Sequence, residues 1–155
     1  MNEMTAGALP LRKRGSSLSA GLATALPPNG ADQRAVAETL HRIHDRIDTI
    51  AINGVLVATR DGVVLSALTR DIENESIAAM AAAAAGLAAQ FTARAKIGGP
   101  RAVFFEGDTG QVGVFSVDAD TLLVVFSERN TTMGMFNVAA KQALALLQQE
   151  IAAHR

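Results

Sequence analysis

The sequence has no cysteine, no tryptophan and no tyrosine among its 155 residues. The absence of cysteine excludes disulfide bonds, thiolate metal sites and cysteine nucleophiles, and it is consistent with a cytoplasmic protein. Neither sign of charge predominates, because 14 basic and 15 acidic residues give a formal net charge of −1. Without a basic excess or an aromatic stacking surface built from Trp and Tyr, the sequence predicts a protein that does not bind nucleic acid.

A long hydrophobic run is missing as well. The longest apolar stretch, residues 78–89, is mostly alanine and is shorter than the roughly 18–20 residues that a membrane span requires. Hydrophobic residues nevertheless make up 49% of the chain and charged residues 19%, which is typical of a packed globular domain. The length corresponds to one domain, so we expect a single core and no membrane span.

The first 30 residues differ in composition from the rest. They are rich in Gly, Ser, Ala and Pro, lack a sustained period and end in Pro27-Pro28-Asn29-Gly30. We interpret residues 1–30 as a flexible tail and residues 31–155 as the folded domain. Two alternatives remain for the tail. Residues 12–14 are basic and precede spaced leucines, which loosely resembles a signal peptide or a short amphipathic segment that contacts a membrane or a partner.

The folded part opens with a predicted helix and a hairpin. Apolar residues at intervals of three and four mark one face of the helix, namely Val36, Leu40, Ile43, Ile47 and Ile50. Two β-branched runs then flank Arg60-Asp61-Gly62, and Asp-Gly is a strong signal for a tight hairpin turn. Residues 52–68 are therefore predicted to form two antiparallel strands around Asp61 and Gly62.

A second helix is predicted from Asp71 to about Arg94, with Asp71 or Asn74 as its N-cap. Its apolar stripe consists of Ile77, Met80, Ala84, Leu87 and Phe91. The opposite side carries small residues, including Ala79, Ala82, Gly86 and Ala89. Alanine favours helices in any context, but Gly86 costs about 1 kcal/mol relative to Ala. We therefore predict that these four small residues form a second buried face, which contacts another subunit in a homodimer.

The remaining sequence predicts three strands and a last helix. The β-rich runs 101–106, 111–117 and 121–127 are joined by short turns, the first of which is bracketed by Gly107 and Gly110. Thr131 or Thr132 can cap the helix, whose apolar face is Phe136, Ala140, Ala143, Leu147 and Ile151. The predicted fold class is α/β, with a five-stranded antiparallel sheet, flanking helices and the order α-β-β-α-β-β-β-α.

The tripeptide Asp108-Thr109-Gly110 also occurs around the catalytic aspartate of aspartic proteases. Such enzymes need two carboxylates that share a proton, and here a flap and a second braced loop are missing. A turn is the better interpretation.

His41 and His44 lie three residues apart, but zinc sites need three or four protein ligands, so surface histidines are expected. No catalytic residue, metal or cofactor is predicted, and the chain is not expected to be an enzyme.

The hairpin "INGVLVATRDGVVLSA", the small-residue helix and the segment "GGPRAVFFEGDTGQVGVF" together resemble the roadblock/dynein light chain family. The resemblance covers about residues 33–153 and is closest to the bacterial members that partner a Ras-like GTPase in gliding motility. Its most specific features are the turns at Asp61-Gly62, at Gly98-Gly99 and around Gly134. Near the last turn, Met133, Met135 and Phe136 form a soft apolar patch, for which core filling is the expected role and a changed partner surface is the alternative.

The resemblance implies a profilin-like roadblock fold, a homodimer with joined sheets and packed second helices, and a Ras-like small GTPase as partner. The protein would act as a scaffold or as an activator of GTP hydrolysis that orders the switch loops of the GTPase. An arginine finger is the other route to activation, and the candidates are Arg60, Arg70, Arg94, Arg101 and Arg129. The alternative function is a small-molecule sensory or structural adaptor domain without a GTPase partner.

Overall fold

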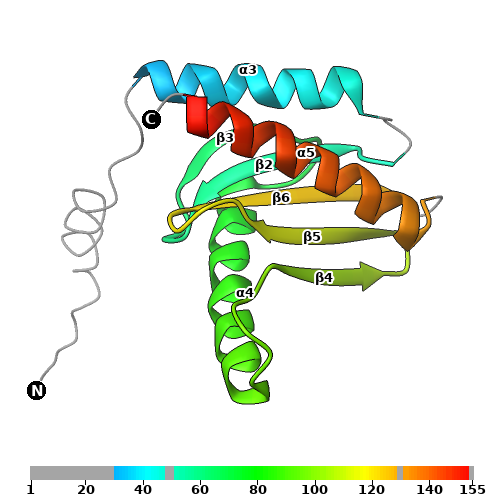
Figure 1. The fold of residues 1–155 in the computed structure, drawn as a ribbon. Coiled ribbons are helices and arrows are strands. Elements are labelled where there is room, and N and C mark those ends of the chain that lie inside the picture. The colour runs from blue at the N-terminus through cyan, green and yellow to red at the C-terminus, as the bar shows by residue number, and fades with distance from the viewer. Residues whose placement is uncertain (1–29, 48–50, 129–130, 154–155) are drawn as a thin grey trace, which may run out of the picture.

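The computed structural model describes residues 30–47, 51–128 and 131–153. They form three helices and five strands in the predicted order (Figure 1). In chain order these are α3 (Gly30–Arg46), β2 (Gly54–Thr59), β3 (Val64–Leu68), α4 (Asn74–Ala95), β4 (Ala102–Gly107), β5 (Gly110–Ser116), β6 (Thr121–Glu128) and α5 (Met133–Ala153). The predicted fold class is confirmed. Residues 1–29 of the predicted tail lie outside the described residues, and Gly30 is already the first residue of α3.

All five strands belong to one antiparallel sheet in the order β3-β2-β6-β5-β4. β4, β5 and β6 form the predicted meander, and β6 pairs with β2, so that Val55 lies opposite Val125. The β2–β3 hairpin turns at Asp61-Gly62, where Gly62 has a φ of 88°. A Cβ at Gly62 would lie 3.2 Å from Cα of Ala79, so this turn requires glycine both for its backbone conformation and for its contact with α4.

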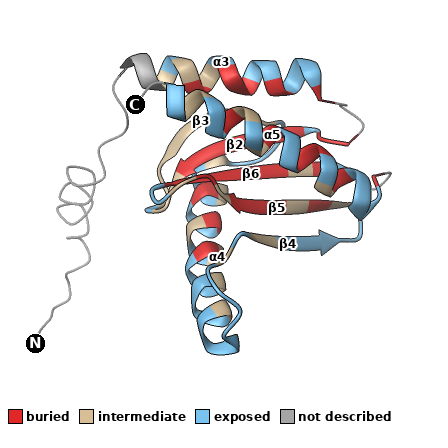
Figure 2. Ribbon diagram, viewed as in Figure 1, coloured by how far each residue is buried: buried red, intermediate tan, exposed pale blue. Residues whose placement is uncertain are grey.

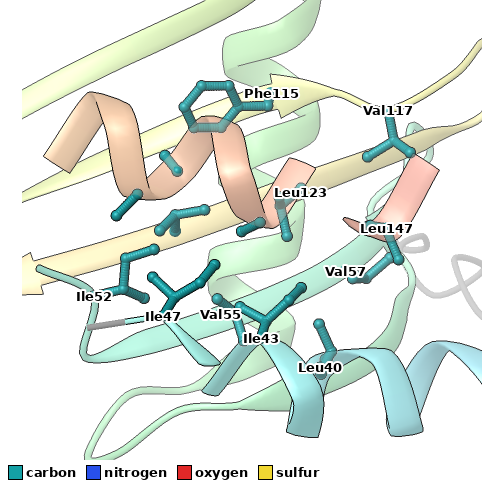
Figure 3. Close-up of a cluster of buried hydrophobic side chains, with 14 of the residues drawn as sticks. Leu40, Ile43, Ile47, Ile52, Val55, Val57, Phe115, Val117, Leu123 and Leu147 are labelled. Carbon is teal, nitrogen blue, oxygen red and sulfur yellow. The ribbon is translucent and has the colours of Figure 1, made fainter. Parts of the chain in front are cut away.

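One face of the sheet is covered by α3 and α5, which contact each other and are joined by an ion pair between Arg42 and Glu150 (Figure 1). The predicted apolar face of α3 is buried at Val36, Leu40, Ile43 and Ile47, while Ile50 lies outside the described residues. Figure 3 shows side chains of α3, α5 and the strands converging in this core. The predicted face of α5 is also confirmed, because Phe136, Ala140, Ala143 and Leu147 are fully buried.

The methionines near the start of α5 do not fill the core. Phe136 is fully buried, but Met133 and Met135 are 39% and 44% exposed, so the expected core-filling role is wrong for both. They lie in the first turn of the helix and point in directions other than that of the buried Phe136. Thr132 is the capping residue, since its Oγ1 accepts a hydrogen bond of 3.1 Å from the backbone N–H of Met135.

Within the described part of the chain, the other face of the sheet is crossed by α4 alone, and here the predicted orientation of the helix is wrong. The buried residues of α4 are Ala78, Ala81 and Ala85, not the stripe of larger side chains. They pack on Leu56, Val114, Leu122 and Val124. Because these strand side chains already fill the layer, a helix packs closely on them only through small residues. The larger residues Met80, Leu87 and Phe91 are left exposed.

The N-cap of α4 also differs from the prediction. Glu73 occupies the cap position without a side-chain hydrogen bond, and Asn74 is already the first helical residue. Oδ1 of Asn74 instead accepts a hydrogen bond of 2.5 Å from Thr69. At the other end, Lys96 adopts a left-handed conformation with φ of 58°, and the N–H groups of Lys96 and Ile97 bond to the last carbonyls of the helix.

The start of β5 generates a prediction about stability. A Cβ at Gly110 would lie 2.4 Å from the backbone carbonyl oxygen of Ser127, so Gly110→Ala forces β5 away from β6. We expect a loss of about 1–3 kcal/mol, as for overpacked sites, and a fall in Tm of roughly 3–10 °C. Gly99→Ala is the control, because nothing lies within 4 Å of its added Cβ. Equal melting of Gly110→Ala and wild type by circular dichroism would contradict the close strand contact.

Candidate functional site

The second half of α4 extends beyond the edge of the sheet at β4 (Figure 1). Figure 2 shows that this half is largely exposed. Met80, Leu87 and Phe91 are 65%, 57% and 68% exposed, and Ile97 directly after the helix is 72% exposed. At 100° per residue, Leu87 and Phe91 lie on one flank of the helix, roughly 110–150° around the helix from the face that packs on the sheet, so they point largely away from it. This flank is an apolar surface that the described part of the chain does not cover.

The predicted interface residues lie on the other flank of α4. Ala79, Gly86 and Ala89 are exposed and Ala82 is half-buried. Nothing lies within 4 Å of a Cβ built on Gly86, so close approach of another backbone at this point is sterically possible. The role of these four residues in a dimer remains a prediction. The larger residues on the opposite flank were not predicted to be part of the interface, because their helical spacing is typical of a stripe that faces the core.

Beside α4, the same face of the sheet carries a hollow of about 910 Å³, which we call the sheet hollow. Phe105, Val112 and Phe126 form its floor, as cross-strand neighbours on β4, β5 and β6. Gly54 on β2 continues the row, opposite Phe126. Residues 69–72, which connect β3 to α4, form one wall. The hollow exists because α4 covers only part of the sheet.

The edge strand β4 borders the sheet hollow. It pairs with β5 on one side only, so its outer edge presents unpaired backbone donors and acceptors. Phe105 points to the hollow and is 52% exposed. Phe104 points to the other face, where its ring packs edge-to-face on Phe115 at a centroid distance of 5.5 Å. The sheet hollow and the edge of β4 thus lie next to each other, and α4 crosses the same face of the sheet.

Arg60 has a structural role among the candidate arginines. Its guanidinium donates hydrogen bonds to Oγ of Ser116 at 2.9 Å and to the carbonyl of Asp118 at 3.0 Å, which ties the β2–β3 hairpin to the end of β5. Arg70, Arg94 and Arg101 are exposed, and Arg129 lies outside the described residues. Arg70 lines the sheet hollow. The structure therefore reduces the set of arginines that can reach a partner.

The glycines predicted at turns occupy the following places. Gly107 ends β4 and Gly110 begins β5, on either side of the two-residue turn Asp108-Thr109. Gly98 has a φ of 96° and lies with Gly99 between α4 and β4. Gly134 is the second residue of α5 rather than part of the turn before it.

The possible catalytic and metal residues are surface groups in the structure. Asp108 is exposed in its turn, and His41 and His44 are exposed on α3. His41 bonds to the carbonyl of Ala37, and Nδ1 of His44 lies 3.7 Å from Asp45. Among the described residues, no group of three histidine or acidic side chains could hold a metal ion.

By length and composition alone, α4 is apolar enough to cross a membrane, unlike the shorter run considered from the sequence. In the fold, its first half packs on the sheet through Ala78, Ala81 and Ala85. The apolar character of α4 therefore has two parts, a small-residue contact within the chain and an exposed flank of larger residues.

Comparison with known proteins identifies the family. The model of the Roadblock/LC7 domain matches residues 43–127. An uncharacterized protein of Methanocaldococcus jannaschii is 30% identical over 97 residues, which are 61% of this chain and 80% of that protein. A second uncharacterized protein of this archaeon is 32% identical over 97 residues, which are 83% of its length.

Solved structures agree with the family model in fold. Myxococcus xanthus MglB superposes with a TM-score of 0.70 over 83% of this chain and 96% of that chain, at 17% identity. The Roadblock/LC7 domain from Streptomyces avermitilis superposes with a TM-score of 0.64 over 76% of this chain and 95% of that chain, at 19% identity. Since the family model spans more than half of the residues, the chain belongs to the Roadblock/LC7 domain family.

Proposed function

We propose that the protein is a homodimeric, non-catalytic regulator that binds a Ras-like small GTPase in the cytoplasm. The observation that carries the proposal is the uncovered apolar surface formed by the flank of α4, the sheet hollow and the edge of β4. Exposed apolar surfaces of this extent mark sites of protein–protein interaction. Residues 31–155 supply the domain in this proposal, and residues 1–30 remain a tail of separate function.

A second copy fits this surface by symmetry. If β4 pairs antiparallel with β4 of a second copy, a two-fold axis passes between the two strands. The projecting half of each α4 then lies over the sheet of the other copy, on the side that its own α4 leaves uncovered. α4 would face the second sheet with the side that packs on its own sheet, and Leu87 and Phe91, which point away from the sheet, would be placed to contact the α4 of the other copy. The same arrangement would cover the projecting half of α4 and fill the sheet hollow.

The GTPase partner is proposed from the family. The chain resembles bacterial roadblock members that partner a Ras-like GTPase, and it superposes on the structure of the gliding protein MglB from Thermus thermophilus with a TM-score of 0.69. A solved MglB structure described as a tetrameric arrangement, on which it superposes equally well, agrees with a fold that self-associates. The proposed mechanism is the ordering of the switch loops of the GTPase, because this requires a shaped surface but no catalytic group.

The proposed dimer can be tested by placing a charged side chain in the proposed interface. Phe91→Asp places a carboxylate on the exposed flank of α4, where it costs little in a monomer and much in a buried interface. We expect the dimer dissociation constant to rise at least about 30-fold, which corresponds to a hot spot of about 2 kcal/mol. Analytical ultracentrifugation measures this change. Val138→Asp is the control, since Val138 is 60% exposed but lies on α5. Dimers of equal strength in all three proteins would exclude this flank of α4 from the interface.

The partner is tested with tagged full-length protein and lysate of its native cells, loaded with a non-hydrolysable GTP analogue or with GDP. We expect a Ras-like GTPase to be enriched in the presence of the analogue by at least about tenfold, corresponding to 1.4 kcal/mol of preference for the active state. Equal capture with both nucleotides would favour a scaffold. If mass spectrometry found no GTPase in either sample, the proposed partner would be wrong while the family assignment stood.

The mechanism of activation is tested with the exposed arginines. Loss of an arginine finger lowers the rate of hydrolysis by about 10³–10⁵. If the protein acts by ordering switch loops, Arg70→Ala, Arg94→Ala and Arg101→Ala should each retain stimulation within about threefold at saturating protein, because uniform binding changes affinity rather than turnover. The measurement is single-turnover GTP hydrolysis by the captured GTPase. A loss of several hundredfold in one variant would replace switch ordering by an arginine finger.

A further inference from the structure

The free edge of β4 presents a short set of backbone hydrogen-bonding groups. Within the described part of the chain, β4 pairs with β5 only (Figure 1). The carbonyl of Arg101, just before the strand, accepts a hydrogen bond of 3.2 Å from the N–H of Ser116. Because successive residues of an antiparallel strand turn their N–H and C=O to alternate sides, Ala102, Phe104 and Glu106 present both groups to the free edge.

This set of groups is symmetric about Phe104, so one register of two antiparallel β4 strands uses all of it. With the two-fold axis at Phe104, this residue faces itself, and Ala102 of each copy faces Glu106 of the other. Every N–H and C=O on the free edge then has a partner. Backbone groups buried in an interface favour this arrangement, since an unpaired donor or acceptor is costly there.

The neighbouring registers leave groups of the edge unpaired. Moving the axis one residue toward the turn places Ala102 opposite Asp108, which lies beyond the end of β4 in the turn to β5. Moving it one residue the other way places Glu106 opposite Pro100, which has no N–H to donate. The two ends of β4 therefore limit the strand to a single fully bonded register.

The side chains of β4 agree with the axis at Phe104. The ring of Phe104 packs edge-to-face on Phe115 and Phe136, at centroid distances of 5.5 and 6.3 Å, yet it is 40% exposed. Across the axis it would meet the same ring of the second copy and extend this aromatic cluster. On the opposite face of the sheet, Val103 of one copy would lie beside Phe105 of the other and continue the floor of the sheet hollow.

We propose that two copies join through β4 in the register that places Phe104 against Phe104, and that this self-complementary edge selects a second copy of the chain as partner. The proposal rests on the homodimer proposed above and adds its strand register and central residue. An exposed apolar edge strand can pair with many other strands. Here only a strand with the same symmetric set of groups satisfies the whole edge, and a partner without it leaves groups unpaired.

The register is tested with single cysteines, because the chain has none of its own. In the proposed register, Val103 faces Phe105 of the second copy in a pair without mutual hydrogen bonds, with Cα atoms about 4.5 Å apart, which suits a disulfide. A mixture of full-length Val103→Cys and Phe105→Cys under a mild oxidant should therefore form linked dimers. We expect linking at least about tenfold faster than for Val138→Cys, because a dimer holds its thiols at a millimolar effective concentration.

Val138→Cys is the control for random collision, since Val138 is 60% exposed on α5. Val103→Cys alone and Phe105→Cys alone should link no faster than this control. In each of them the two thiols lie diagonally across the strands, with Cα atoms about 7–8 Å apart, which is beyond the reach of a disulfide. Non-reducing gel electrophoresis over time measures the rates, and thermal unfolding shows that each variant is folded.

The other outcomes separate the register from the dimer. Rapid linking of Val103→Cys or Phe105→Cys with itself would move the axis to that residue, so the register would be wrong and the dimer would stand. If wild type dimerises in analytical ultracentrifugation but neither the mixture nor a single variant exceeds the control, the copies do not join through β4. A wild-type protein that is monomeric at high concentration would overturn the homodimer and the register with it.

The contact at Phe104 is tested independently by charges at its own position. Phe104→Lys and Phe104→Glu each place like charges face to face across the axis, which destabilises a strand pair. We expect the dissociation constant of each homodimer to rise at least about tenfold over wild type. In a mixture of the two variants, lysine faces glutamate, so the heterodimer should be at least about tenfold tighter than either homodimer. Equal affinities of the mixture and the homodimers would show that position 104 does not meet itself.

Discussion

The antiparallel pairing of β2 with β6 joins the two halves of the sheet, and the remaining architecture depends on it. The β2–β3 hairpin and the β4–β5–β6 meander are local structures, each formed by neighbouring segments of the chain. Only the pairing of β2 with β6 makes them a single surface. It also buries both faces of the central strands, because α3 and α5 pack on one side and α4 on the other. With β2 and β6 in the centre, β3 and β4 become the two edges, and β4 is the edge that α4 crosses and passes.

The close contact between α4 and the sheet explains the surface that is left over. Ala78, Ala81 and Ala85 allow α4 to lie directly on large strand side chains such as Leu56 and Leu122. A single helix about 10 Å wide cannot cover a face of five strands, so part of the sheet remains open as the sheet hollow. The helix is also longer than the sheet is wide (Figure 1), so its second half extends into solvent with its apolar flank exposed. One geometric mismatch therefore produces both the projecting helix and the hollow that a second copy can fill.

The proposed function in protein binding draws on the same features. The exposed surface consists of apolar side chains, an unpaired strand edge and a few separated charges, all of which serve recognition. Arg60 illustrates how the fold limits the available groups, since the sequence allows it as an arginine finger but the structure uses it to fasten two turns together. In the proposed dimer, apolar contacts would provide most of the affinity, as is general at the buried centre of protein interfaces.

The sequence by itself determined the elements and their order, because helix periodicity, β-branched runs and turn residues are local signals. The apolar faces of α3 and α5 and the turn at Asp61-Gly62 were correctly predicted for this reason. The orientation of α4 was not correctly predicted, because the largest apolar side chains of a helix normally face the core and here they do not. Only the tertiary structure decided that alanines pack on the sheet and that Leu87 and Phe91 remain exposed, since this depends on the volume already occupied by strands distant in sequence. The row of Phe105, Val112 and Phe126 likewise required strand register, which places residues from three strands side by side.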